Sequence, residues 1–219
     1  MLKPLGQCRL YAFVDAAYLH GRAADTVAEQ LCAGGADLIQ IRAKSFSEEQ
    51  VEQIVKKVLP ITRGCGVRLV VNDHWNLARE TGADLCHLGQ EDFFEAGYRK
   101  AADLPGFSPP PGLGLSTHSP EQAQRALAAA PDYIAIGPVY ATGTKPSAKP
   151  VTLEYVRWAA EHVRIPWFAI GGIHLGNLDE VLAAGATRIC VVSAILNQDD
   201  PAAACRMFKE RLAVAAPIP

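Results

Sequence analysis

Short runs of hydrophobic residues alternate along the chain with longer segments whose hydrophobic positions recur with helical spacing. The short runs are nearly continuous in hydrophobic character over about five residues, which is typical of parallel strands buried on both faces. They predict strands at Leu10–Asp15, Leu38–Arg42, Arg68–Asn72, Leu85–Leu88, Gly112–Ser116, Tyr133–Gly137, Trp167–Ile170 and Arg188–Val192. The longer segments predict helices at Ala23–Cys32, Glu48–Thr62, Asn76–Thr81, Pro120–Ala129, Leu153–His162, Leu178–Ala184 and Ala202–Ala213. The pattern therefore predicts a series of strand–helix units.

Capping residues support several of these boundaries. Ser47 followed by Gln50 is a capping-box pattern, in which each side chain accepts a hydrogen bond from the other residue's backbone N–H. Ser119 before Pro120 offers a cap followed by proline at the first helical position, where no N–H is needed. Glycines that favour a left-handed helix end follow three predicted helices, at Gly34-Gly35, Gly82 and Gly185. The stretch Pro105–Pro111 lies between two strand–helix units, so we interpret it as a loop rather than a domain boundary.

The distribution of polar residues distinguishes two folds that such units can form. An open, doubly wound sheet gathers its ligand-binding residues at one switch point, whereas a closed barrel draws them from the carboxyl ends of many strands. Polar residues or glycines follow all the predicted strands but the first, at Gln40, Arg42, Lys44, Asn72, Asp73, Gln90, Glu91, Asp92, Ser116, Thr117, His118, Thr142, Thr144, Lys145, Gly171, Gly172 and Ser193. Because these groups converge only if the sheet closes, we predict an α/β fold, a single (βα)8 TIM barrel. One domain would span residues 1–219, with its core at about residues 10–212.

Composition and charge narrow the class of protein further. Hydrophobic residues make up 49% of the 219 residues and charged residues 20%, and 21 Lys and Arg face 23 Asp and Glu for a net charge of −2. This composition excludes a disordered chain, and no hydrophobic run approaches the roughly 18 residues of a membrane span. The near-neutral charge argues against nucleic acid as the main partner. Because the N-terminus has no signal-peptide pattern, we expect a cytoplasmic protein, and a homo-oligomer is compatible with the sequence.

The cysteines give no indication of a disulfide framework. There are six, at Cys8, Cys32, Cys65, Cys86, Cys190 and Cys205. None has Cys-x-x-Cys spacing, and most lie within hydrophobic segments. We therefore interpret them as small buried residues with free thiols.

Two aspartates, Asp73 and Asp92, follow neighbouring strands. Mg²⁺ usually takes one or two protein carboxylates and completes its shell with water and substrate phosphate, so this pair is a candidate Mg²⁺ site. The alternative for Asp73 is a helix cap, and the alternative for Asp92 is a cap or a solvated loop carboxylate. The cations at nearby strand ends favour the metal interpretation.

Those cations predict an anion-binding site. Gln40, Arg42 and Lys44 alternate on one extended segment, so their side chains leave the same side of the strand. The alternative for Arg42 is an ion pair with a carboxylate inside the barrel. Lys145 lies in a loop with Gly143, and such a loop can close over a ligand, although a solvated surface position is the usual state of a loop lysine.

A second anion site is predicted at the ends of the last two strands. Gly171 and Gly172 allow backbone N–H groups to approach a ligand closely, and Ser193 opens the turn after the eighth strand. The corresponding loops of such barrels often hold a phosphate group.

Other catalytic chemistries have little support in the sequence. We interpret His87, inside a predicted strand, as a hydrogen-bonded interior histidine rather than a ligand. No Cys and His cluster has zinc-site spacing. No Ser-His-Asp order or Gly-x-Ser-x-Gly motif indicates covalent catalysis.

Seven motifs, in order along the chain, resemble those of the thiamine phosphate synthase family. They are Gln40-Ile-Arg-Ala-Lys44, Val71-Asn-Asp73, His87-Leu-Gly-Gln-Glu-Asp92, Gly114-Leu-Ser-Thr-His118, Gly137-Pro-Val-Tyr-Ala-Thr-Gly-Thr-Lys-Pro146, Ala169-Ile-Gly-Gly-Ile173 and Val191-Val-Ser-Ala-Ile195. The resemblance extends from Leu10 to Leu212, and the shared order of the motifs makes it specific.

The resemblance implies a transferase of thiamine biosynthesis. Such an enzyme joins 4-amino-2-methyl-5-hydroxymethylpyrimidine diphosphate to a thiazole phosphate, carboxylated or not, and yields thiamine phosphate and diphosphate. It implies Mg²⁺ as the cofactor, bound by Asp73 and Asp92, and small phosphorylated molecules as substrates. The residues implied for the pyrimidine diphosphate are Gln40, Arg42, Lys44, Asn72, Ser116 and Lys145, of which Arg42, Lys44, Ser116 and Lys145 are the catalytic candidates. Those implied for the thiazole phosphate are Thr142, Gly143, Thr144, Gly172, Val192 and Ser193.

The family mechanism is dissociative. Diphosphate leaves first, a carbocation stabilised by the aminopyrimidine forms, and the thiazole nitrogen captures it. Stabilising a departing anion requires cations and Mg²⁺ rather than a nucleophile, which agrees with the residues present.

The chain departs from the family pattern in places, and two other functions compete. Ala43 stands where the family usually has an acid, the segment after Tyr11 differs, and residues 95–111 do not follow the usual spacing. A related tautomerase branch, which isomerises the thiazole phosphate on the same barrel, tends to have histidine where this chain has Pro138 and to lose the Mg²⁺ and diphosphate residues. Pro138 together with Asp73, Asp92 and Lys145 therefore favours the synthase. The other alternative, a non-catalytic phosphate-binding regulator, would not need polar residues at so many strand ends.

Overall fold

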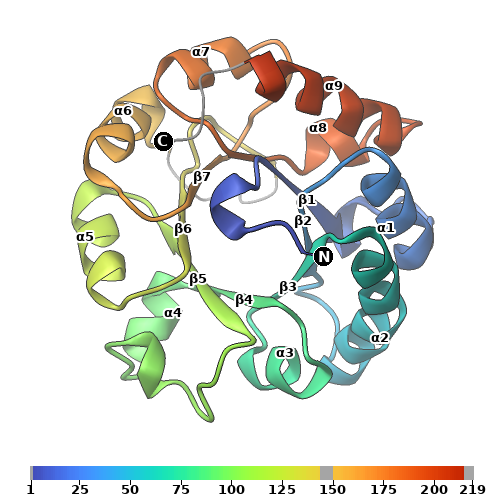
Figure 1. Cartoon of the computed structure of the whole chain (residues 1–219), viewed down its shortest axis with the longest axis horizontal. Helices are drawn as coiled ribbons and strands as arrows, with labels where there is room; N and C mark the ends of the chain where they lie inside the picture. Colours follow the sequence, from blue (N-terminus) through green and yellow to red (C-terminus); the bar gives the residue numbers. More distant parts are fainter. Residues whose placement is uncertain (1, 144–149, 215–219) are drawn as a thin grey trace.

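The computed structural model describes residues 2–143 and 150–214. Parallel strands close into a barrel in the order β1 to β8, and helices surround it (Figure 1). The strands are β1 (Leu10–Asp15), β2 (Leu38–Arg42), β3 (Arg68–Asn72), β4 (Leu85–Gly89), β5 (Gly112–Thr117), β6 (Tyr133–Ile136), β7 (Trp167–Ile170) and β8 (Ile189–Cys190). The predicted (βα)8 barrel is confirmed.

The helices follow the strands as the strand–helix repeat predicts. They are α1 (Ala24–Ala33), α2 (Glu48–Cys65), α3 (Trp75–Thr81), α4 (Gln90–Glu95), α5 (Pro120–Ala128), α6 (Thr152–His162), α7 (Leu178–Ala183), α8 (Ser193–Leu196) and α9 (Pro201–Val214), with short 3-10 helices η1 (Leu5–Gln7), η2 (Ala16–Tyr18) and η3 (Ala101–Asp103). The hydrophobic pattern does not predict α4 and α8. Both are short, and neither begins with a side chain that caps it.

The predicted caps are present at α2 and α5. Ser47 Oγ accepts a hydrogen bond from the N–H of Gln50 (3.4 Å), and Gln50 Oε1 accepts one from the N–H of Ser47 (2.9 Å), which completes the capping box. Ser119 Oγ accepts from the N–H of Gln122 (3.2 Å), and Pro120 occupies the first position of α5. Local chemistry therefore defines where these helices begin.

The last strand is shorter than predicted. Its regular pairing is confined to Ile189 and Cys190, although the N–H of Val191 still donates to the carbonyl of Tyr11 (2.9 Å). The next residue, Val192, leaves the extended conformation, with φ −112° and ψ −86°, and α8 starts at Ser193. The prediction of a strand to Val192 is therefore wrong, because the chain must turn there to begin a helix.

Three aspartates form hydrogen bonds between neighbouring strands at the amino-terminal end of the barrel. Asp37, Asp84 and Asp132 stand directly before β2, β4 and β6. Their carboxylates accept hydrogen bonds from the N–H groups of Leu10 (3.0 Å), Leu69 (2.8 Å) and Leu113 (2.7 Å) on the preceding strands. The same device thus joins β1 to β2, β3 to β4 and β5 to β6.

Asp37 has further partners that make it a buried ionic junction. Its carboxylate forms ion pairs with Lys3 (2.9 Å) and with Lys209 of α9 (2.8 Å), and it is 8% exposed. Burial acts to raise the pKa of Asp37, but the bonds from Lys209, Leu10 and Lys3 outweigh it and hold that pKa below its usual value. The N-terminal segment and the last helix are therefore tied to one carboxylate.

The N-terminal segment also covers this end of the barrel. In Figure 1, η1 lies over the centre of the ring of strands. Arg188 Nη2 donates to the carbonyl of Gly6 (2.6 Å), and Arg68 Nε donates to that of Lys3 (3.1 Å). Because the amino-terminal end is covered, ligands must reach the barrel from the carboxyl ends of the strands.

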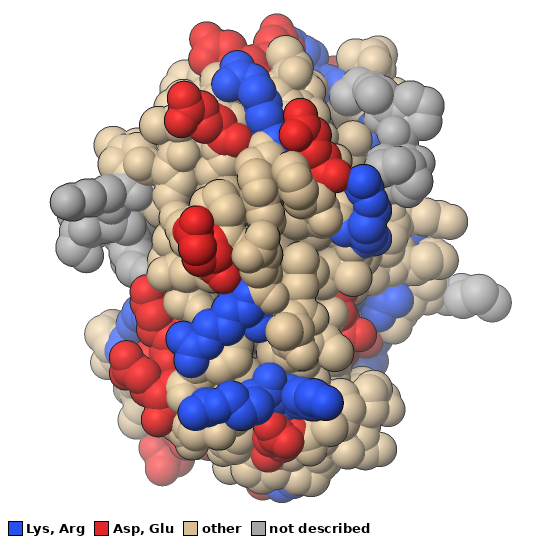
Figure 2. Space-filling view, turned by 90° about the vertical axis from the view of Figure 1, so that its left-hand side faces the viewer, with Lys and Arg blue, Asp and Glu red and all other residues tan. Residues whose placement is uncertain are grey.

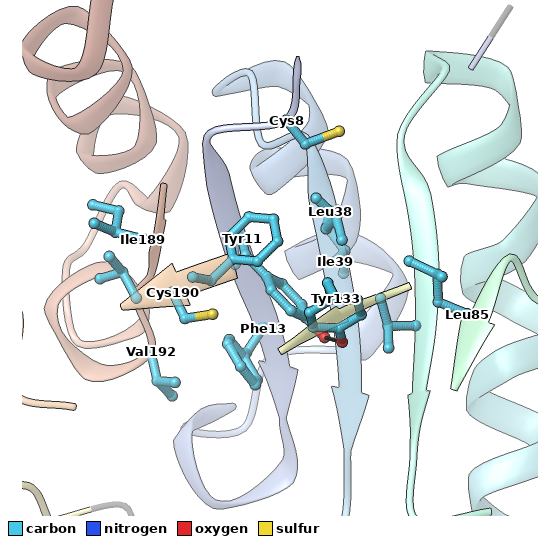
Figure 3. Packing of buried hydrophobic residues seen from close by; sticks show 14 of the residues in the cluster. Cys8, Tyr11, Phe13, Leu38, Ile39, Leu85, Tyr133, Ile189, Cys190 and Val192 are labelled. Atoms are coloured by element: carbon cyan, nitrogen blue, oxygen red, sulfur yellow. Dashed lines mark hydrogen bonds between the residues drawn. The ribbon is translucent and has the colours of Figure 1, made fainter. Parts of the chain in front are cut away.

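Aromatic rings fill part of the barrel interior. Tyr11 stacks on Phe13 with ring centroids 5.2 Å apart, and Tyr11, Tyr133 and Phe168 meet edge to face at 5.4–5.9 Å. Figure 3 shows Tyr11 and Tyr133 side by side among the buried hydrophobic residues. The interior is thus packed beneath the site described below.

The cysteines largely follow the prediction. All six are free thiols, and Cys8, Cys86, Cys190 and Cys205 are buried. Cys32 is half-buried, and Cys65, the last residue of α2, is exposed.

Charges of both signs are mixed on the surface. On the face shown in Figure 2, Lys and Arg side chains lie among Asp and Glu side chains. Within residues 2–143 and 150–214, no helix has both the length and the hydrophobicity that crossing a bilayer requires. The expectation that nucleic acid is not the main partner stays a prediction.

Candidate active site

A cavity of about 300 Å³ opens at the carboxyl ends of the barrel strands. Residues at the ends of all eight strands contribute to its lining, from Phe13 of β1 to Cys190 of β8. The predicted site residues that line it are Gln40, Arg42, Lys44, Asn72, Asp73, Asp92, Ser116, Thr142, Gly172, Val192 and Ser193. Gly143 is not among the lining residues, and Thr144 and Lys145 lie outside the described part of the chain. The barrel therefore brings together most residues that the sequence singled out.

Arg42 is held by a buried carboxylate. Its Nη1 lies 2.8 Å from Oδ2 of Asp15, which is only 2% exposed, while Arg42 itself is 18% exposed and lines the cavity. Asp15 is the register partner of Arg42 on the neighbouring strand, and its Oδ1 accepts a hydrogen bond from the N–H of Ala17 (3.0 Å). Both interpretations of Arg42 are thus present together: it pairs with an interior carboxylate, and it faces the cavity with its remaining donors.

Lys44 and Asp73 form the second ion pair of the cavity. Lys44 Nζ lies 3.4 Å from Asp73 Oδ2, and their side chains are 59% and 37% exposed. The helix-cap alternative for Asp73 is wrong, because His74 holds the N-cap position of α3 and no side chain caps that helix. Asp73 instead adopts a left-handed backbone conformation with φ 67°, between β3 and α3.

Asp92 approaches the cavity from the first turn of α4. A glycine makes room for it, because a Cβ atom at Gly89 would lie 2.4 Å from Asp92 Oδ2. The cap alternative for Asp92 is not observed, since Gly89 is the N-cap residue of α4 and no side chain bonds the cap. No ion-pair partner of Asp92 is present among the described residues.

The two carboxylates suit Mg²⁺ better than an ion that the protein must coordinate fully. Asp73 and Asp92 line the same cavity, and the described residues contain no cluster of three or more His, Cys, Asp and Glu that could hold a metal. Mg²⁺ needs only one or two carboxylates, with water and substrate phosphate in its other positions. The donor set therefore fits Mg²⁺ bound with a phosphorylated substrate.

Backbone groups line the other side of the cavity, at the ends of β7 and β8. Gly171 and Gly172 have positive φ angles of 105° and 64°. A Cβ atom at Gly172 would lie 2.7 Å from the carbonyl oxygen of Ala141, so the next loop packs directly against this glycine. Among the described residues, none accepts a hydrogen bond from the N–H of Gly172 or Ser193. Such N–H groups can bind a phosphate.

His87 lies deep in the cavity wall and takes part in a buried hydrogen-bond chain. Its Nδ1 is 2.9 Å from Oη of Tyr133, and the two rings stack with centroids 5.6 Å apart. Burial, and then the positive charge of Lys44, lower the pKa of His87 to about 4, so the imidazole is neutral near pH 7. The structure agrees with the interpretation of His87 as a hydrogen-bonded interior residue.

His118, at the end of β5, is a further lining residue. Its Nδ1 bonds the carbonyl oxygen of Gly137, and its backbone N–H donates to Gln122 Oε1 (2.7 Å). These bonds fix the ring between β5 and the Gly137-Pro138 turn.

Comparisons with known proteins bear on this geometry. A sequence model of the thiamine monophosphate synthase family matches residues 10–195. The chain belongs to this family. It is similar to a thiamine-phosphate synthase of Thermus thermophilus, with 46% identity over 186 residues that cover 84% of this chain and 86% of the relative. It is also similar to one of an Arthrobacter species, with 41% identity over an alignment that covers 92% of this chain and 93% of the relative.

A solved structure shares the fold of this thiamine phosphate synthase family member. The thiamine phosphate pyrophosphorylase of Pyrococcus furiosus superposes with a TM-score of 0.83 at 28% identity, and the match covers 96% of this chain and 98% of that one. The family and the enzyme type predicted from the motifs, a thiamine phosphate synthase, are confirmed. The individual residue roles stay predictions.

Sequence reasoning did not single out Tyr11, which lines the thiamine phosphate synthase cavity, or Asp15 and Tyr133, which bond to the lining residues Arg42 and His87. Asp15, Tyr11 and Tyr133 lie in strands whose hydrophobic character hides their polar atoms. A signal existed for Asp15, because an acid that ends β1 stands in register with Arg42 at the end of β2. The tyrosines had no such signal, since a tyrosine in a buried strand is ordinarily a packing residue.

Proposed function

We propose that the cavity binds the pyrimidine diphosphate together with Mg²⁺ at the ends of β2 to β5, and the thiazole phosphate at the ends of β7 and β8. One observation supports this division above all. Carboxylate and cationic side chains gather at one side of the cavity, and free backbone N–H groups at the other. Since β3 and β7 lie four strands apart in a closed ring of eight, the two groups face each other across the barrel.

The diphosphate would be bound by Arg42, Lys44 and Lys145. Arg42 is oriented by Asp15, so its remaining N–H groups are fixed before the substrate arrives. Lys44 is more exposed and can transfer from Asp73 to a phosphate oxygen. Gln40, Asn72 and Ser116 line the cavity beside them and would bind the rest of the pyrimidine substrate through neutral hydrogen bonds.

Asp73 and Asp92 would hold Mg²⁺. The bound ion would neutralise negative charge on the diphosphate and make it a better leaving group. Asp92 is kept close to the cavity by the missing side chain at Gly89, and Asp73 by the turn that ends β3.

The thiazole phosphate would be bound by Gly172, Val192 and Ser193, together with Thr142, Gly143 and Thr144. The N–H groups of Gly172 and Ser193 offer donors that need no side chain, and the hydroxyl of Ser193 adds one more. Binding the phosphate here would direct the thiazole ring toward the centre of the cavity.

The proposed reaction is the dissociative one that the family resemblance implies. The bond between the pyrimidine methylene carbon and the diphosphate oxygen breaks, and its electron pair leaves with the diphosphate. The aminopyrimidine stabilises the carbocation, and the ring nitrogen of the thiazole then donates its electron pair to the methylene carbon. Arg42, Lys44 and Lys145 would stabilise the charge that develops on the leaving group. The products are thiamine phosphate and diphosphate.

The test is direct. The protein is mixed with the pyrimidine diphosphate, thiazole phosphate and Mg²⁺, and thiamine phosphate is measured by chromatography. Well-folded protein that makes none would refute the synthase assignment. Isomerisation of the thiazole phosphate without the pyrimidine substrate would support the tautomerase alternative instead.

A substitution of Asp92 tests the assignment of the Mg²⁺ site. Asp92→Ala should abolish turnover while thiazole phosphate binding, measured by calorimetry, stays nearly unchanged. Asp199→Ala removes an exposed aspartate elsewhere and serves as the matched control. Unchanged turnover in Asp92→Ala would remove Asp92 from the Mg²⁺ site.

A further inference from the structure

A continuous chain of hydrogen bonds, buried except at His87, runs from the cavity through the barrel interior and back to the cavity. Gln40 Nε2 lies 2.5 Å from Tyr11 Oη, Tyr11 Oη lies 2.9 Å from Tyr133 Oη, and Tyr133 Oη lies 2.9 Å from His87 Nδ1. The four residues come from β2, β1, β6 and β4. Gln40 and His87, at the two ends of the chain, both line the cavity.

The orientation of the Gln40 amide gives this chain a direction, because its nitrogen faces Tyr11. Burial raises the pKa of Tyr11 and of Tyr133 well above the usual value, so each hydroxyl keeps its single proton. The amide nitrogen of Gln40 donates to Tyr11, so the proton of Tyr11 must go to Tyr133, and that of Tyr133 to His87. His87 Nδ1 is then the acceptor, and the proton of the neutral imidazole is on Nε2.

The direction determines what the two ends present to a ligand. With its nitrogen held by Tyr11, Gln40 turns its carbonyl Oε1 away from the chain, and no described residue donates to that oxygen. A reversed chain would expose the amide nitrogen of Gln40 and an unprotonated Nε2 of His87. The two end groups are therefore linked, although they stand on different strands.

We propose that Tyr11, Tyr133 and His87 are positioning residues that hold the carbonyl oxygen of Gln40 toward the cavity, so that the site selects a pyrimidine with an amino group over one with an oxo group. The proposal rests on the proposed function, because it concerns the pyrimidine substrate of that site. An amino group donates to the Gln40 oxygen, whereas an oxo group would place a second acceptor against it.

The packing around the chain keeps it in one arrangement. Tyr11 is enclosed by Phe13 and Phe168, whose ring centroids lie 5.2 and 5.4 Å from its own. Gly114 of β5 leaves space for Tyr133, because a Cβ atom there would lie 2.5 Å from the Tyr133 hydroxyl oxygen. Figure 3 shows Tyr11 and Tyr133 within the packed interior, where water does not compete for their hydroxyls.

Tyr133→Phe tests the proposal with the loss of one oxygen atom. Without Tyr133 Oη as its acceptor, the Tyr11 hydroxyl can donate back to Gln40 Oε1, and the amide is free to reverse. The control is Tyr155→Phe, which removes another buried hydroxyl, bonded to Thr117 (2.6 Å) and not part of the chain.

Binding is the appropriate readout, because the amino group also stabilises the carbocation and would affect turnover for chemical reasons. The probes are the 4-amino and the 4-oxo forms of the pyrimidine monophosphate, titrated by calorimetry with Mg²⁺ present. Wild type and Tyr155→Phe should prefer the amino form, and Tyr133→Phe should lose about tenfold of that preference. An undiminished preference in Tyr133→Phe would overturn the proposal.

A second measurement does not depend on a variant that folds. The nitrogen chemical shifts of His87 in the wild-type protein distinguish Nε2–H from Nδ1–H. Nε2–H is expected, and Nδ1–H would reverse the chain and overturn the proposal. Failure of the proposed function is distinguishable, because wild-type protein would then bind neither pyrimidine probe.

Discussion

Gly89→Ala places one methyl group against the candidate Mg²⁺ site. The backbone at Gly89 has φ −60° and ψ 129°, which alanine adopts without strain. The added Cβ atom would lie 2.4 Å from Asp92 Oδ2, 3.3 Å from its Cγ and 3.8 Å from its Cβ. The clash is thus confined to the carboxylate, and the substitution tests the position of Asp92 while leaving its charge in place.

The size of the effect follows from the distances. A carbon and an oxygen atom in contact are ordinarily about 3.3 Å apart, so Asp92 Oδ2 must move by about 1 Å. Mg²⁺ requires near-ideal coordination distances, and a misplacement of about 1 Å in a catalytic site can lower the rate about 100-fold. We therefore expect kcat/KM to fall about 100-fold at low Mg²⁺ and to recover in part at high Mg²⁺.

The assay is thiamine phosphate formation across a Mg²⁺ titration, with thermal unfolding measured on the same samples. Gly64→Ala is the control, because Gly64 lies within α2 and, apart from the local helix backbone and its chain neighbours, nothing lies within 4 Å of the added Cβ. It should stabilise the helix slightly and leave the Mg²⁺ dependence unchanged. If Gly89→Ala kept the wild-type Mg²⁺ dependence, Asp92 would not be a ligand at this position.

Three further predictions concern the rest of the barrel. Asp37→Asn should lower the free energy of unfolding in urea by about 2–4 kcal/mol, because the two lysines that contact this buried carboxylate lose their counter-charge. The pKa of Asp37 in the folded protein is below its usual value of 3.8. The stabilisation of the fold by the Asp37 carboxylate is therefore complete above pH 3.8 and is lost as the pH falls through the lower folded-state pKa. The variant should lose less stability on acidification than wild type. Asp15→Asn should cost about 3 kcal/mol in thermal unfolding, because Arg42 loses a buried partner, and an unchanged midpoint would contradict this. Gly172→Ala should weaken thiazole phosphate binding about tenfold in calorimetry, and undiminished affinity would exclude this glycine from the phosphate site.

The fold could be predicted closely because its main determinants are local. The strands β1, β2, β3 and β7 have the predicted bounds, since each is a hydrophobic run that ends at a polar residue or a glycine. The strand β8 could not be placed as well, because Val191 and Val192 continue the hydrophobic run after regular pairing has ended. A hydrophobic run indicates burial rather than strand pairing, and Val191 and Val192 are buried although the regular strand has ended.

The sequence predicts which strand ends form the site, but it does not predict the ion pairs between their side chains. The sequence shows that Arg42 and Lys44 leave β2 on one side, and the structure adds that Arg42 has Asp15 as its partner while Lys44 has Asp73. Those pairs depend on the register between strands, which a hydrophobic pattern does not specify to the residue. The types of side chain at a strand end can be read from the sequence, whereas the ion pairs that they form depend on which strands are neighbours in the closed barrel.

Three glycines near the cavity also have structural roles that the sequence does not reveal. In the sequence, Gly89 and Gly114 are ordinary glycines of a strand or a turn, and Gly172 is a candidate for the phosphate site. In the structure, a Cβ atom at each would lie within 3 Å of a particular neighbour: the carboxylate of Asp92, the ring and hydroxyl of Tyr133, and the carbonyl of Ala141. Only Gly172 also requires a positive φ angle, so backbone conformation alone explains one of the three. Gly89 leaves space for the carboxylate of Asp92, which lies three residues later in the first turn of α4, so this contact is local. Gly114 leaves space for Tyr133 of the neighbouring strand β6, and that contact depends on the register between the two strands.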